Sequence, residues 1–358
     1  MPERVDETTR ERLARLTTLR LGGPARELVH AADEEQLLDA VRQADASRTP
    51  LLVLAGGSNV VVADAGFDGV VVRVETTGVT VDQDTCGGAA VTVAAGEPWD
   101  PFVARAVDTG WVGLEALSGI PGSVGATPIQ NVGAYGQEVA DTIASVRCWD
   151  RLDGRQRTYA AADCGFGYRT SRFKREPDRH VVLSVTFQLR LGTLSEPVRY
   201  AELARRLDVP LGARAPMAGV RRAVLALRAG KGMVLDAADH DTWSAGSFFT
   251  NPVLAADAAD LLPEDAPRWP QPDGSVKTSA AWLIEHAGYG RGFGKRFGTG
   301  RAALSDKHTL ALSNRGGAST DDLLALAAEV RRGVERRYGV RLVPEPVLVG
   351  CSLPEDGG

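Results

Sequence analysis

The stretch SGIPGSVGATPIQNVGAYG, residues 118–136, decides which folds are open to this chain. It holds five glycines and two prolines but no charged residue. A solvated loop of this length would be polar, whereas this one carries apolar residues between its glycines. Glycine allows the backbone to approach another surface closely, and its exposed N–H groups can hold an anion without a basic side chain. The composition alone fits a ligand-binding loop and a buried irregular connection equally well.

A second glycine-rich segment is LLVLAGGSNVVVAD, residues 51–64. Its pattern predicts a buried strand over residues 51–54, a tight turn at Gly-Gly-Ser-Asn and another strand over residues 60–62. The turn alone is equally typical of a plain hairpin. Two such loops in one chain favour a cofactor that bears phosphate. Neither segment fits G-x-G-x-x-G or G-x-x-x-x-G-K-[ST], which argues against a Rossmann fold and a P-loop.

The bulk composition describes a globular protein of more than one domain. A chain of 358 residues predicts two or three domains, and 44% apolar with 24% charged residues is ordinary for a soluble protein. The net charge of −5 argues against nucleic acid and membrane surfaces as partners. The sequence shows no leader-like apolar region and no run of transmembrane length, so a cytoplasmic location is expected.

The cysteines and histidines are not spaced as metal ligands would be. None of the cysteines forms a C-x-x-C pair, so they are expected to be reduced packing residues: Cys86, Cys148, Cys164 and Cys351. The histidines stand alone, and no metal site is expected: His30, His180, His240, His286 and His308.

Strand and helix patterns alternate along the chain, which indicates an α/β or α+β arrangement. Besides the two strands above, strands are predicted over residues 70–74, 90–94, 143–149, 181–191 and 340–350. Helices are predicted over residues 34–44, 101–110, 221–227, 279–285 and 321–337. The first sixteen residues have the character of a charged surface helix, and the Pro- and acid-rich residues 262–274 that of a surface loop.

Three short segments carry residues that could take part in binding or catalysis. GFGYRTSRFK, residues 165–174, contains arginines that could hold a carboxylate in a bidentate manner; a solvated turn with surface ion pairs is the alternative. WSAGSFFTNP, residues 243–252, offers a serine without an evident base. Such a serine is a poor nucleophile but could protonate a strongly basic carbanion; otherwise it caps the packing of two phenylalanines.

The third segment is Pro344-Glu345-Pro346 near the end of an apolar run. The prolines restrict the backbone on both sides of the carboxylate. A buried glutamate is usually paired or functional, whereas a glutamate on an edge strand would face water.

Together these motifs resemble one family over nearly the whole length of the chain. Five motifs occur in order: GGSN (56–59), IPGSVGATPIQNVGAYG (120–136), YRxSxFK (168–174), GSFFxNP (246–252) and PEPV (344–347). They are similar to those of the UDP-N-acetylenolpyruvoylglucosamine reductases, flavoenzymes also known as UDP-N-acetylmuramate dehydrogenases.

The resemblance implies an α+β fold. It would consist of a two-subdomain FAD-binding fold of the vanillyl-alcohol-oxidase type and a third α+β domain that binds substrate. The implied boundaries are residues 1–80 for the first FAD-binding subdomain, completed by 331–358. Residues 81–192 would form the second subdomain and residues 193–330 the substrate-binding domain.

The resemblance also implies the reaction and its partners. NADPH would reduce FAD, and the reduced flavin would pass a hydride to the β-carbon of UDP-N-acetylglucosamine enolpyruvate. Protonation of the α-carbon would then give UDP-N-acetylmuramate for peptidoglycan synthesis. By resemblance Ser247 is the proton donor, and Arg169 and Glu345 stabilise the intermediate. Arg169 suits the negative charge that develops on the substrate carboxylate, and Glu345 would be protonated or hydrogen-bonded beside that charge, because like charges repel.

The same resemblance assigns binding residues. FAD would contact Gly56, Gly57, Ser58, Asn59, Gly119, Pro121, Gly122, Ser123, Gly125, Ala126, Gly133, Ala134, Tyr135 and Gly136. Of these, the side chains of Ser58 and Asn59 would meet the FAD pyrophosphate. The substrate would contact Tyr168, Tyr200, Lys231 and Asn251, with Lys231 at the UDP pyrophosphate. Residues 283–288 lack a glutamine that some members use near the substrate, which leaves the role of His286 open.

Two other functions fit parts of the sequence. An FAD-dependent hydroxy-acid or sugar oxidase of the same fold would need neither the GSFFxNP motif nor NADPH. A catalytically silent flavin- or UDP-sugar-binding protein would be expected to have lost Arg169, Ser247 or Glu345, all of which are present. A monomer is expected.

Overall fold

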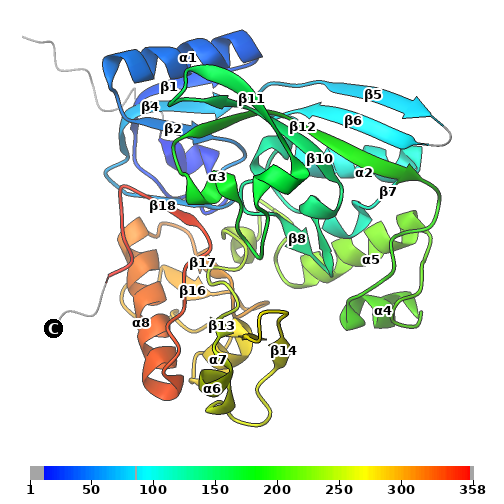
Figure 1. Cartoon of the computed structure of the whole chain (residues 1–358). Coiled ribbons are helices and arrows are strands. Elements are labelled where there is room, and N and C mark those ends of the chain that lie inside the picture. The colour runs from blue at the N-terminus through cyan, green and yellow to red at the C-terminus, as the bar shows by residue number, and fades with distance from the viewer. Residues whose placement is uncertain (1–11, 85–86, 355–358) are drawn as a thin grey trace, which may run out of the picture. The chain divides into compact units, whose positions relative to one another are not determined.

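The structure, a computed structural model, describes residues 12–84 and 87–354, and these divide into two compact units. Unit 1 comprises the described residues within Met1–Pro24, Gly57–Phe67 and Lys231–Gly358, and unit 2 comprises Ala25–Gly56 and Asp68–Gly230. Each unit has an apolar core of its own. Figure 1 labels the elements of both units.

Unit 2 begins with a small sheet covered by one helix. Its strands lie in the order β1-β4-β2, and β2 runs parallel to β4. Helix α1 starts at Asp33, whose side chain accepts from the backbone N–H of Gln36 at 2.8 Å, and packs its apolar side on this sheet (Figure 1). The bounds are β1 Ala25–Ala31, α1 Glu34–Ser47, β2 Leu51–Leu54 and β4 Phe67–Val74.

A six-stranded sheet forms the larger part of unit 2. Its order is β11-β10-β12-β6-β5, with β7 paired to the end of β12. The pairings are antiparallel. Helix α2 covers it, and Trp99, Phe102 and Phe187 pack there with ring centroids 5.4–6.1 Å apart. The bounds are β5 Val79–Asp84, β6 Gly88–Ala94, α2 Trp99–Thr109, β7 Trp111–Val112, β10 Ile143–Asp150, β11 Arg155–Ala160 and β12 His180–Leu191.

The remaining elements of unit 2 are short or helical. Helices α4 and α5 pack on each other around a small core that includes Leu203 and Val224. The bounds are β8 Gly133–Ala134, β9 Gln137–Glu138, α3 Arg172–Arg175, α4 Ala201–Leu207 and α5 Met217–Gly230.

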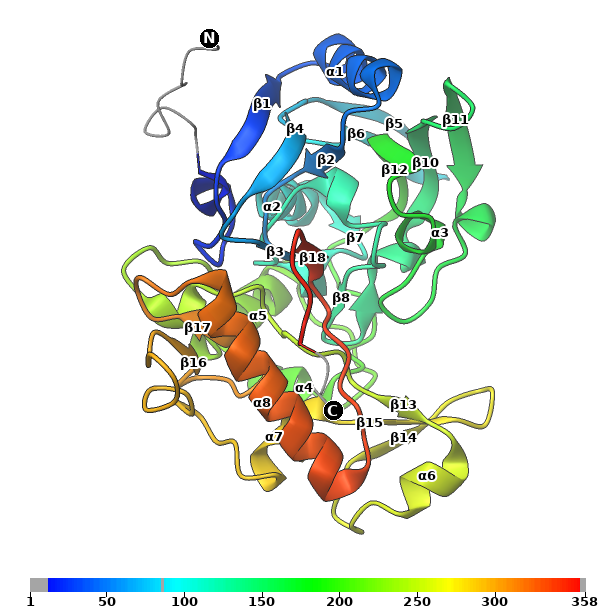
Figure 2. The same cartoon turned by 90° about the vertical axis from the view of Figure 1, so that its left-hand side faces the viewer.

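Unit 1 is built around a long helix, α8, with two short strands and α7 packed beside it (Figure 2). Ser319 and Asp322 form a capping box at its start, and the Asp64 carboxylate accepts from the Thr320 N–H at 2.8 Å. The sheets are β13-β15-β14, β16-β17 and β18-β3. The bounds are β3 Val60–Val62, β13 Val253–Leu254, α6 Ala256–Asp260, β14 Arg268–Pro270, β15 Val276–Thr278, α7 Ala280–His286, β16 Ala302–Leu304, β17 Leu312–Asn314, α8 Thr320–Tyr338 and β18 Val347–Val349.

The Gly-Gly-Ser-Asn turn joins strands of different sheets. Strand β2 before it pairs in parallel with β4, while β3 after it pairs in parallel with β18 from the C-terminal end of the chain. The predicted strands and turn are therefore confirmed, and the hairpin alternative is wrong.

Most predicted elements are confirmed, with helices up to several residues longer than the sequence pattern indicated. The predicted strand over 340–350 is wrong except at β18. Pro344 and Pro346 have no N–H to give to a ladder, and the N–H of Glu345 between them bonds to Phe248 O at 2.8 Å. Residues 262–274 are not a simple surface loop, because Leu262 and Ala266 are buried and β14 follows.

The prediction for the first sixteen residues falls largely outside the described residues. Within them, Leu13–Leu16 is a short 3₁₀ turn whose two leucines are buried, so a charged surface helix is wrong for this part. Among the described residues no helix is both long and apolar enough to cross a bilayer.

The described cysteines Cys148, Cys164 and Cys351 are free thiols, and Cys86 lies outside the described residues. Burial raises the pKa of the Cys148 and Cys164 thiols. These two are therefore unreactive at neutral pH and act as packing groups, as predicted.

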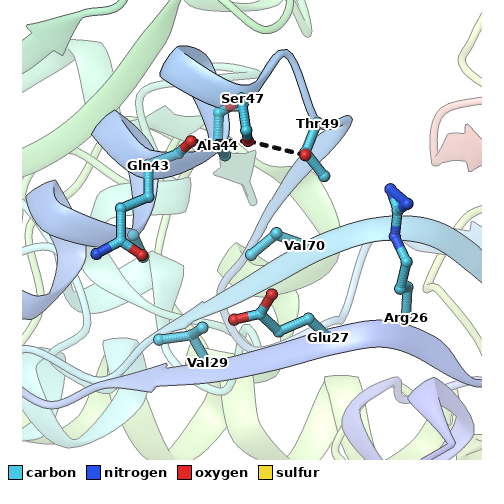
Figure 3. Close-up of a pocket in the computed structure, with 9 residues that line it drawn as sticks. Arg26, Glu27, Val29, Gln43, Ala44, Ser47, Thr49 and Val70 are labelled. Atoms are coloured by element: carbon cyan, nitrogen blue, oxygen red, sulfur yellow. Dashed lines mark hydrogen bonds between the residues drawn. The ribbon is translucent and has the colours of Figure 1, made fainter.

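One surface hollow of about 550 Å³ lies in unit 2 between α1 and the strands β1 and β4 (Figure 3). Small residues Ala40 and Ala44 on α1 leave this space above Val29 and Val70 of the sheet. None of the residues predicted to bind FAD or substrate lines it, so it is not the predicted site.

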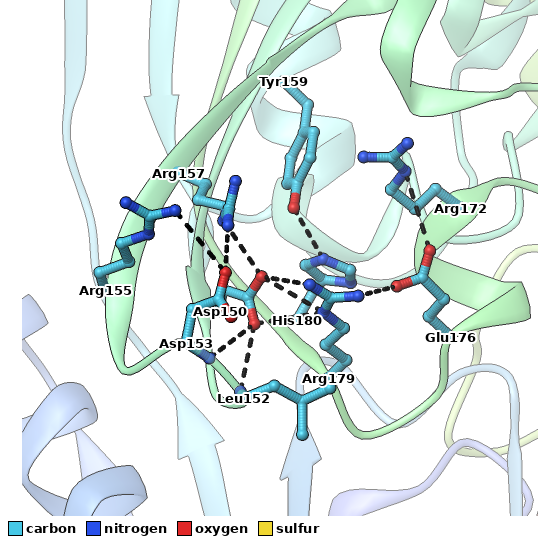
Figure 4. Close-up of polar contacts among 10 residues, drawn as sticks. All are labelled: Asp150, Leu152, Asp153, Arg155, Arg157, Tyr159, Arg172, Glu176, Arg179 and His180. Atoms are coloured by element: carbon cyan, nitrogen blue, oxygen red, sulfur yellow. Dashed lines mark hydrogen bonds and ion pairs between the residues drawn. The ribbon is translucent and has the colours of Figure 1, made fainter.

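A buried carboxylate fixes one end of the large sheet (Figure 4). Asp150, at the end of β10, is fully buried and pairs with Arg179 at 2.9 Å and with Arg157 at 3.2 Å. It also accepts from the backbone N–H groups of Leu152 and Asp153. Burial alone would raise the pKa of Asp150, but these hydrogen bonds, led by that of Arg179, hold it below its ordinary value.

We expect Asp150→Asn to lower the free energy of unfolding by about 3 kcal/mol, because it leaves two arginines facing a neutral amide. The depressed folded-state pKa means that the contribution of Asp150 is complete above the ordinary carboxyl value of about 4 and is lost as the pH falls through the lower folded value. Urea unfolding at a series of pH values should therefore show the gap between wild type and variant closing in acid.

Asp68→Asn is the control, since the Asp68 carboxylate is 94% exposed and pairs with Arg26 at the surface. It should change stability little at any pH. A gap for Asp150→Asn that stays constant from neutral to acid pH would contradict the assigned ionisation.

Candidate active site

The two glycine-rich segments approach each other within unit 2 as bare backbone. A Cβ atom added at Gly56 would lie 2.7 Å from Gly122 Cα, and one added at Gly125 would lie 2.5 Å from Ala95 Cβ. Neither position can hold a side chain without movement of a neighbour. The glycines at 56 and 122 therefore bring the first turn and the long loop into backbone contact.

Both backbone hydrogen bonds and a few side chains hold the long loop, residues 118–136. It is anchored to the segment before α2 by bonds that start at Trp99, Val124 and Gly125 and end at Gly122, Glu97 and Ala95, at 2.8–3.1 Å. The N–H of Gly119 donates to the Asp100 carboxylate at 2.6 Å. The loop is thus ordered although its regular structure is limited to a turn of 3₁₀ helix, Val124–Ala126, and the short strand β8.

The loop has features that a phosphate-bearing cofactor requires. Ser123 Oγ is buried and has no hydrogen-bond partner among the described residues. A buried hydroxyl without a partner is costly, and a phosphate oxygen or a cofactor hydroxyl would satisfy it. The close backbone contact at these glycines and the buried Ser123 hydroxyl together fit FAD as the bound cofactor.

A buried arginine beside this loop was not predicted from the sequence. Arg228 of α5 is 8% exposed, and a Cβ at Gly119 would lie 3.4 Å from its Nε. Burial lowers the pKa of the Arg228 guanidinium, while Tyr135 and Asp100 oppose that change. Arg228 is a candidate counter-charge for phosphate. The signal was available, because Val220, Val224 and Arg228 follow at intervals of four and so share the buried face of α5.

Arg169 lies in a strained conformation next to the long loop. Its φ of +51° is in the left-handed region, which is uncommon for a residue with a side chain and is typical of functional sites. Its Nη2 donates to Gly133 O at 2.8 Å, and its guanidinium lies 5.4 Å from the ring centre of Tyr168. Unit 2 thus brings two predicted substrate contacts, Tyr168 and Arg169, to the end of the predicted FAD loop.

The segment after Arg169 is tied down on both sides. Ser171 caps helix α3 by accepting from the Lys174 N–H, and its hydroxyl donates to Ile129 O of the long loop at 2.5 Å. After the helix, Glu176 pairs with Arg179 of the Asp150 cluster at 2.8 Å (Figure 4). The backbone that carries Arg169 is therefore coupled to the large sheet, which explains how a strained φ is maintained.

Tyr135, near the same end of the long loop, meets Tyr200. Their rings are perpendicular with centroids 5.4 Å apart. Burial raises the pKa of Tyr135 to about 12, so it is neutral at physiological pH. Tyr200, just before α4, remains 43% exposed, as expected for a residue that would contact substrate.

A buried glutamate organises the start of this loop and was also not predicted. The Glu115 carboxylate is fully buried and accepts from Gly113 N, Gln137 Nε2 and Glu196 N at 2.7–2.9 Å. It thereby connects the two ends of residues 115–137 with the chain that leads to Tyr200. A lone acidic residue inside the apolar run WVGLEAL was the sequence signal.

In unit 1 the predicted proton donor and the predicted carboxylate lie on paired backbone segments. Phe248, next to Ser247, accepts from the Glu345 N–H at 2.8 Å, and Phe249 forms a bridge with Pro344. The first turn joins the same arrangement, because Asn59 Nδ2 donates to Glu345 O at 3.4 Å and Asn59 O accepts from Val347 N at 3.0 Å. Three motifs far apart in the sequence are thus hydrogen-bonded neighbours.

The other residues of unit 1 that the sequence analysis singled out lie elsewhere in that unit. The Asn251 side chain accepts from the Ala280 N–H at 3.0 Å and so helps to start α7. Lys231 follows α5 directly and begins the last stretch of unit 1. His286 stacks on Trp282 with centroids 3.9 Å apart, and its Nδ1 bonds to Trp282 O at 2.8 Å at the end of α7.

Comparison with known sequences agrees with this architecture. A model of the FAD binding domain family matches residues 25–159, and a model of the UDP-N-acetylenolpyruvoylglucosamine reductase C-terminal domain matches residues 238–349. The fold and site therefore define a flavoprotein with a two-subdomain FAD-binding fold and a further C-terminal α+β domain, as predicted.

Full-length relatives identify the family. The UDP-N-acetylenolpyruvoylglucosamine reductase of Cutibacterium acnes is 61% identical over 341 residues, 95% of this chain and 90% of that protein. That of Salinispora arenicola is 58% identical over 348 residues, 95% of each. The crystal structure of the enzyme from Thermus caldophilus superposes with a TM-score of 0.64 at 27% identity, over 95% of this chain and 98% of that one. The chain belongs to the UDP-N-acetylenolpyruvoylglucosamine reductase family.

The close contact between Gly56 and Gly122 allows a test of cofactor binding. Gly56→Ala should lower the ratio of flavin absorbance to protein in the purified material, because the new Cβ forces the turn away from Gly122. Gly219→Ala is the control. Gly219 lies in α5 with open space around it, and alanine there should add up to about 1 kcal/mol of stability. Flavin content equal to wild type in Gly56→Ala would argue against this turn as part of the FAD site.

Proposed function

We propose that the chain catalyses the NADPH-dependent reduction of UDP-N-acetylglucosamine enolpyruvate to UDP-N-acetylmuramate with FAD as cofactor. This step belongs to peptidoglycan precursor synthesis. The product carries the lactyl ether in place of the enol ether. The likeness to full-length reductases over 95% of the chain supports the activity.

One observation supports the proposed mechanism in addition to the family relationship. Ser247, Glu345 and Asn59 stand on three backbone segments that hydrogen-bond to one another in unit 1. A proton donor, a carboxylate and the predicted flavin turn in one rigid arrangement are what a reductase needs at its second half-reaction. An oxidase of the same flavin fold has no use for such a donor.

FAD, when bound, supplies the two-electron chemistry by taking a hydride from NADPH and passing it to the β-carbon of the enol ether. The chain's contribution to FAD is its binding loop. Gly56, Gly122 and Gly125 allow close backbone approach, Ser123 offers a buried hydroxyl, and Arg228 offers a buried positive charge.

Arg169 would hold the substrate carboxylate. Negative charge grows on that group when the β-carbon is reduced, and a guanidinium already fixed in position stabilises it without reorganisation. Its hydrogen bond to Gly133 O and the anchoring of the Tyr168–Arg169 backbone supply that fixation.

Ser247 would then protonate the α-carbon. A serine hydroxyl is a weak acid, but an enediolate is a strong base, so the transfer is feasible. Glu345 would stabilise the same intermediate as a hydrogen-bonding or protonated carboxyl group, because a free anion would repel the growing charge. Lys231, Asn251, Tyr168 and Tyr200 would hold the nucleotide and sugar portions.

An anaerobic absorbance experiment tests the whole proposal. NADPH is added to the purified protein first and UDP-N-acetylglucosamine enolpyruvate second. Loss of the oxidised flavin spectrum and its return on addition of the enolpyruvate would support both half-reactions. Bleaching that only oxygen reverses would favour an oxidase, and a purified protein without flavin spectrum would contradict the proposal.

The proton-donor role makes a separate prediction. Ser247→Ala should leave the rate of flavin reduction by NADPH within about twofold of wild type and slow reoxidation by the enolpyruvate by about 10²-fold or more, the usual range for a lost general acid. Stopped-flow absorbance measures the two rates in one protein, so the first serves as the control for the second. An equal loss in both would contradict the role of Ser247.

The predicted cytoplasmic location and monomeric state stay predictions. Cell fractionation and sedimentation of the purified holoprotein would test them directly.

A further inference from the structure

Thr18 contacts both the predicted flavin turn and the segment of the predicted proton donor, and nothing in its sequence context marks it. It lies in unit 1 and is 7% exposed. Its backbone N–H donates to Gly57 O at 3.1 Å, and its hydroxyl donates to Ser244 O at 2.7 Å. A single residue thus connects residues 56–59 with residues 243–252.

The bond to Ser244 comes just before the predicted donor. On the other side of Ser247 the next fixed point is Phe248, whose N–H donates to Leu310 O at 2.8 Å. Between these points lies Gly246 with a φ of +72°, a conformation that glycine adopts easily, and its N–H donates to Ser244 Oγ at 3.2 Å. Ser244 also forms a bridge with Ser313, so the direction of Ser247 depends in part on the bond that Thr18 makes to the Ser244 carbonyl.

The hydrogen bond from Thr18 to Ser244 O is buried, so water cannot replace it without a cost in free energy. Ser244 is 5% exposed, and a buried carbonyl that loses its donor either stays unsatisfied or moves to find another partner. Movement of this carbonyl would turn the peptide that leads to Ser247.

We propose that Thr18 is a positioning residue for proton transfer: its hydroxyl fixes the donor segment in register with the flavin turn. The proposal rests on the function proposed above. Thr18 acts through Ser244 and Gly57 and does not itself meet the substrate. Its removal should impair the step that needs Ser247 and spare the step that needs only flavin and NADPH.

The chain provides a matched control in the preceding residue. Thr17 is 5% exposed, and its hydroxyl also makes buried hydrogen bonds, but these go to the N–H and C=O of Leu21 within one local turn. Thr17→Val and Thr18→Val each keep the side-chain shape and remove one buried hydroxyl. Each should cost about 1 kcal/mol of stability, so stability alone does not separate them.

The first measurement is the pair of half-reactions by stopped-flow absorbance on holoenzyme. Thr18→Val should slow reoxidation by UDP-N-acetylglucosamine enolpyruvate about tenfold to hundredfold, as expected for a misplaced reacting group. It should leave flavin reduction by NADPH within about twofold of wild type, and Thr17→Val should leave both rates within about twofold. Equal effects of the two variants, or an equal loss in both half-reactions of Thr18→Val, would overturn the proposal.

The second measurement does not need the loaded enzyme. Hydrogen exchange of the apoprotein should be faster in peptides covering residues 243–252 of Thr18→Val than in wild type, and unchanged there in Thr17→Val. Unchanged exchange in Thr18→Val would overturn the proposal. If wild-type enzyme is not reoxidised by the enolpyruvate, the proposed function fails, whereas the exchange result still tests the role of Thr18 in holding the segment.

A second pair of variants isolates the hydroxyl should Thr18→Val fail to fold. Thr18→Ser and Thr18→Ala differ only in that group. Thr18→Ser should keep reoxidation within about threefold of wild type, while Thr18→Ala should show the full loss. The same rate in both would overturn the proposal.

Discussion

The contact of bare backbone at the two glycine-rich segments is the constraint on which the rest of the structure depends. Gly56 and Gly122 meet without side chains, and the turn that follows passes from a strand of unit 2 into a strand of unit 1. A Cβ at Gly57 would lie 1.8 Å from Leu16 O, so this second glycine is held just as tightly on the other side. Neither glycine can therefore take a side chain unless the backbone next to it moves. A cofactor bound by such backbone needs no helix N-terminus of the Rossmann kind.

Charge around the predicted flavin site comes from side chains outside the loops. Residues 118–136 contain no charged side chain, yet Asp100, Arg221 and Arg228 lie directly behind them. Asp100 pairs with Arg221 at 2.6 Å and accepts from Gly119 N; burial would raise the pKa of Asp100, but these hydrogen bonds lower it. Asp100 thus stays ionised and orders the loop. Arg228 is buried beside the same loop and places a positive charge there.

Local sequence was enough to predict the strands and turns, but not which segments they pair with. Strands β2 and β3 and the turn between them follow from alternation and glycine placement, but their parallel pairing with β4 and β18 joins residues that no local pattern connects. Pro344 and Pro346 were read correctly as fixing Glu345, while the apolar residues around them predicted a strand that the missing N–H groups prevent. Thr18 and Glu115 were missed for a related reason. A buried threonine or glutamate shows its importance only through the carbonyl or amide it contacts, and these lie 226 and up to 81 residues away.

The residues proposed as proton donor and as holder of the substrate carboxylate lie in different units, and each set is held in place within its own unit. Ser247, Glu345 and Asn59 belong to unit 1, and Arg169 with Tyr168 belongs to unit 2. Each group is rigid within its own unit: the first through backbone bonds among three segments, the second through α3 and the Asp150 cluster. Neither half needs the other in order to be organised, because strain at Arg169 is balanced inside unit 2 and the Glu345 backbone is fixed inside unit 1.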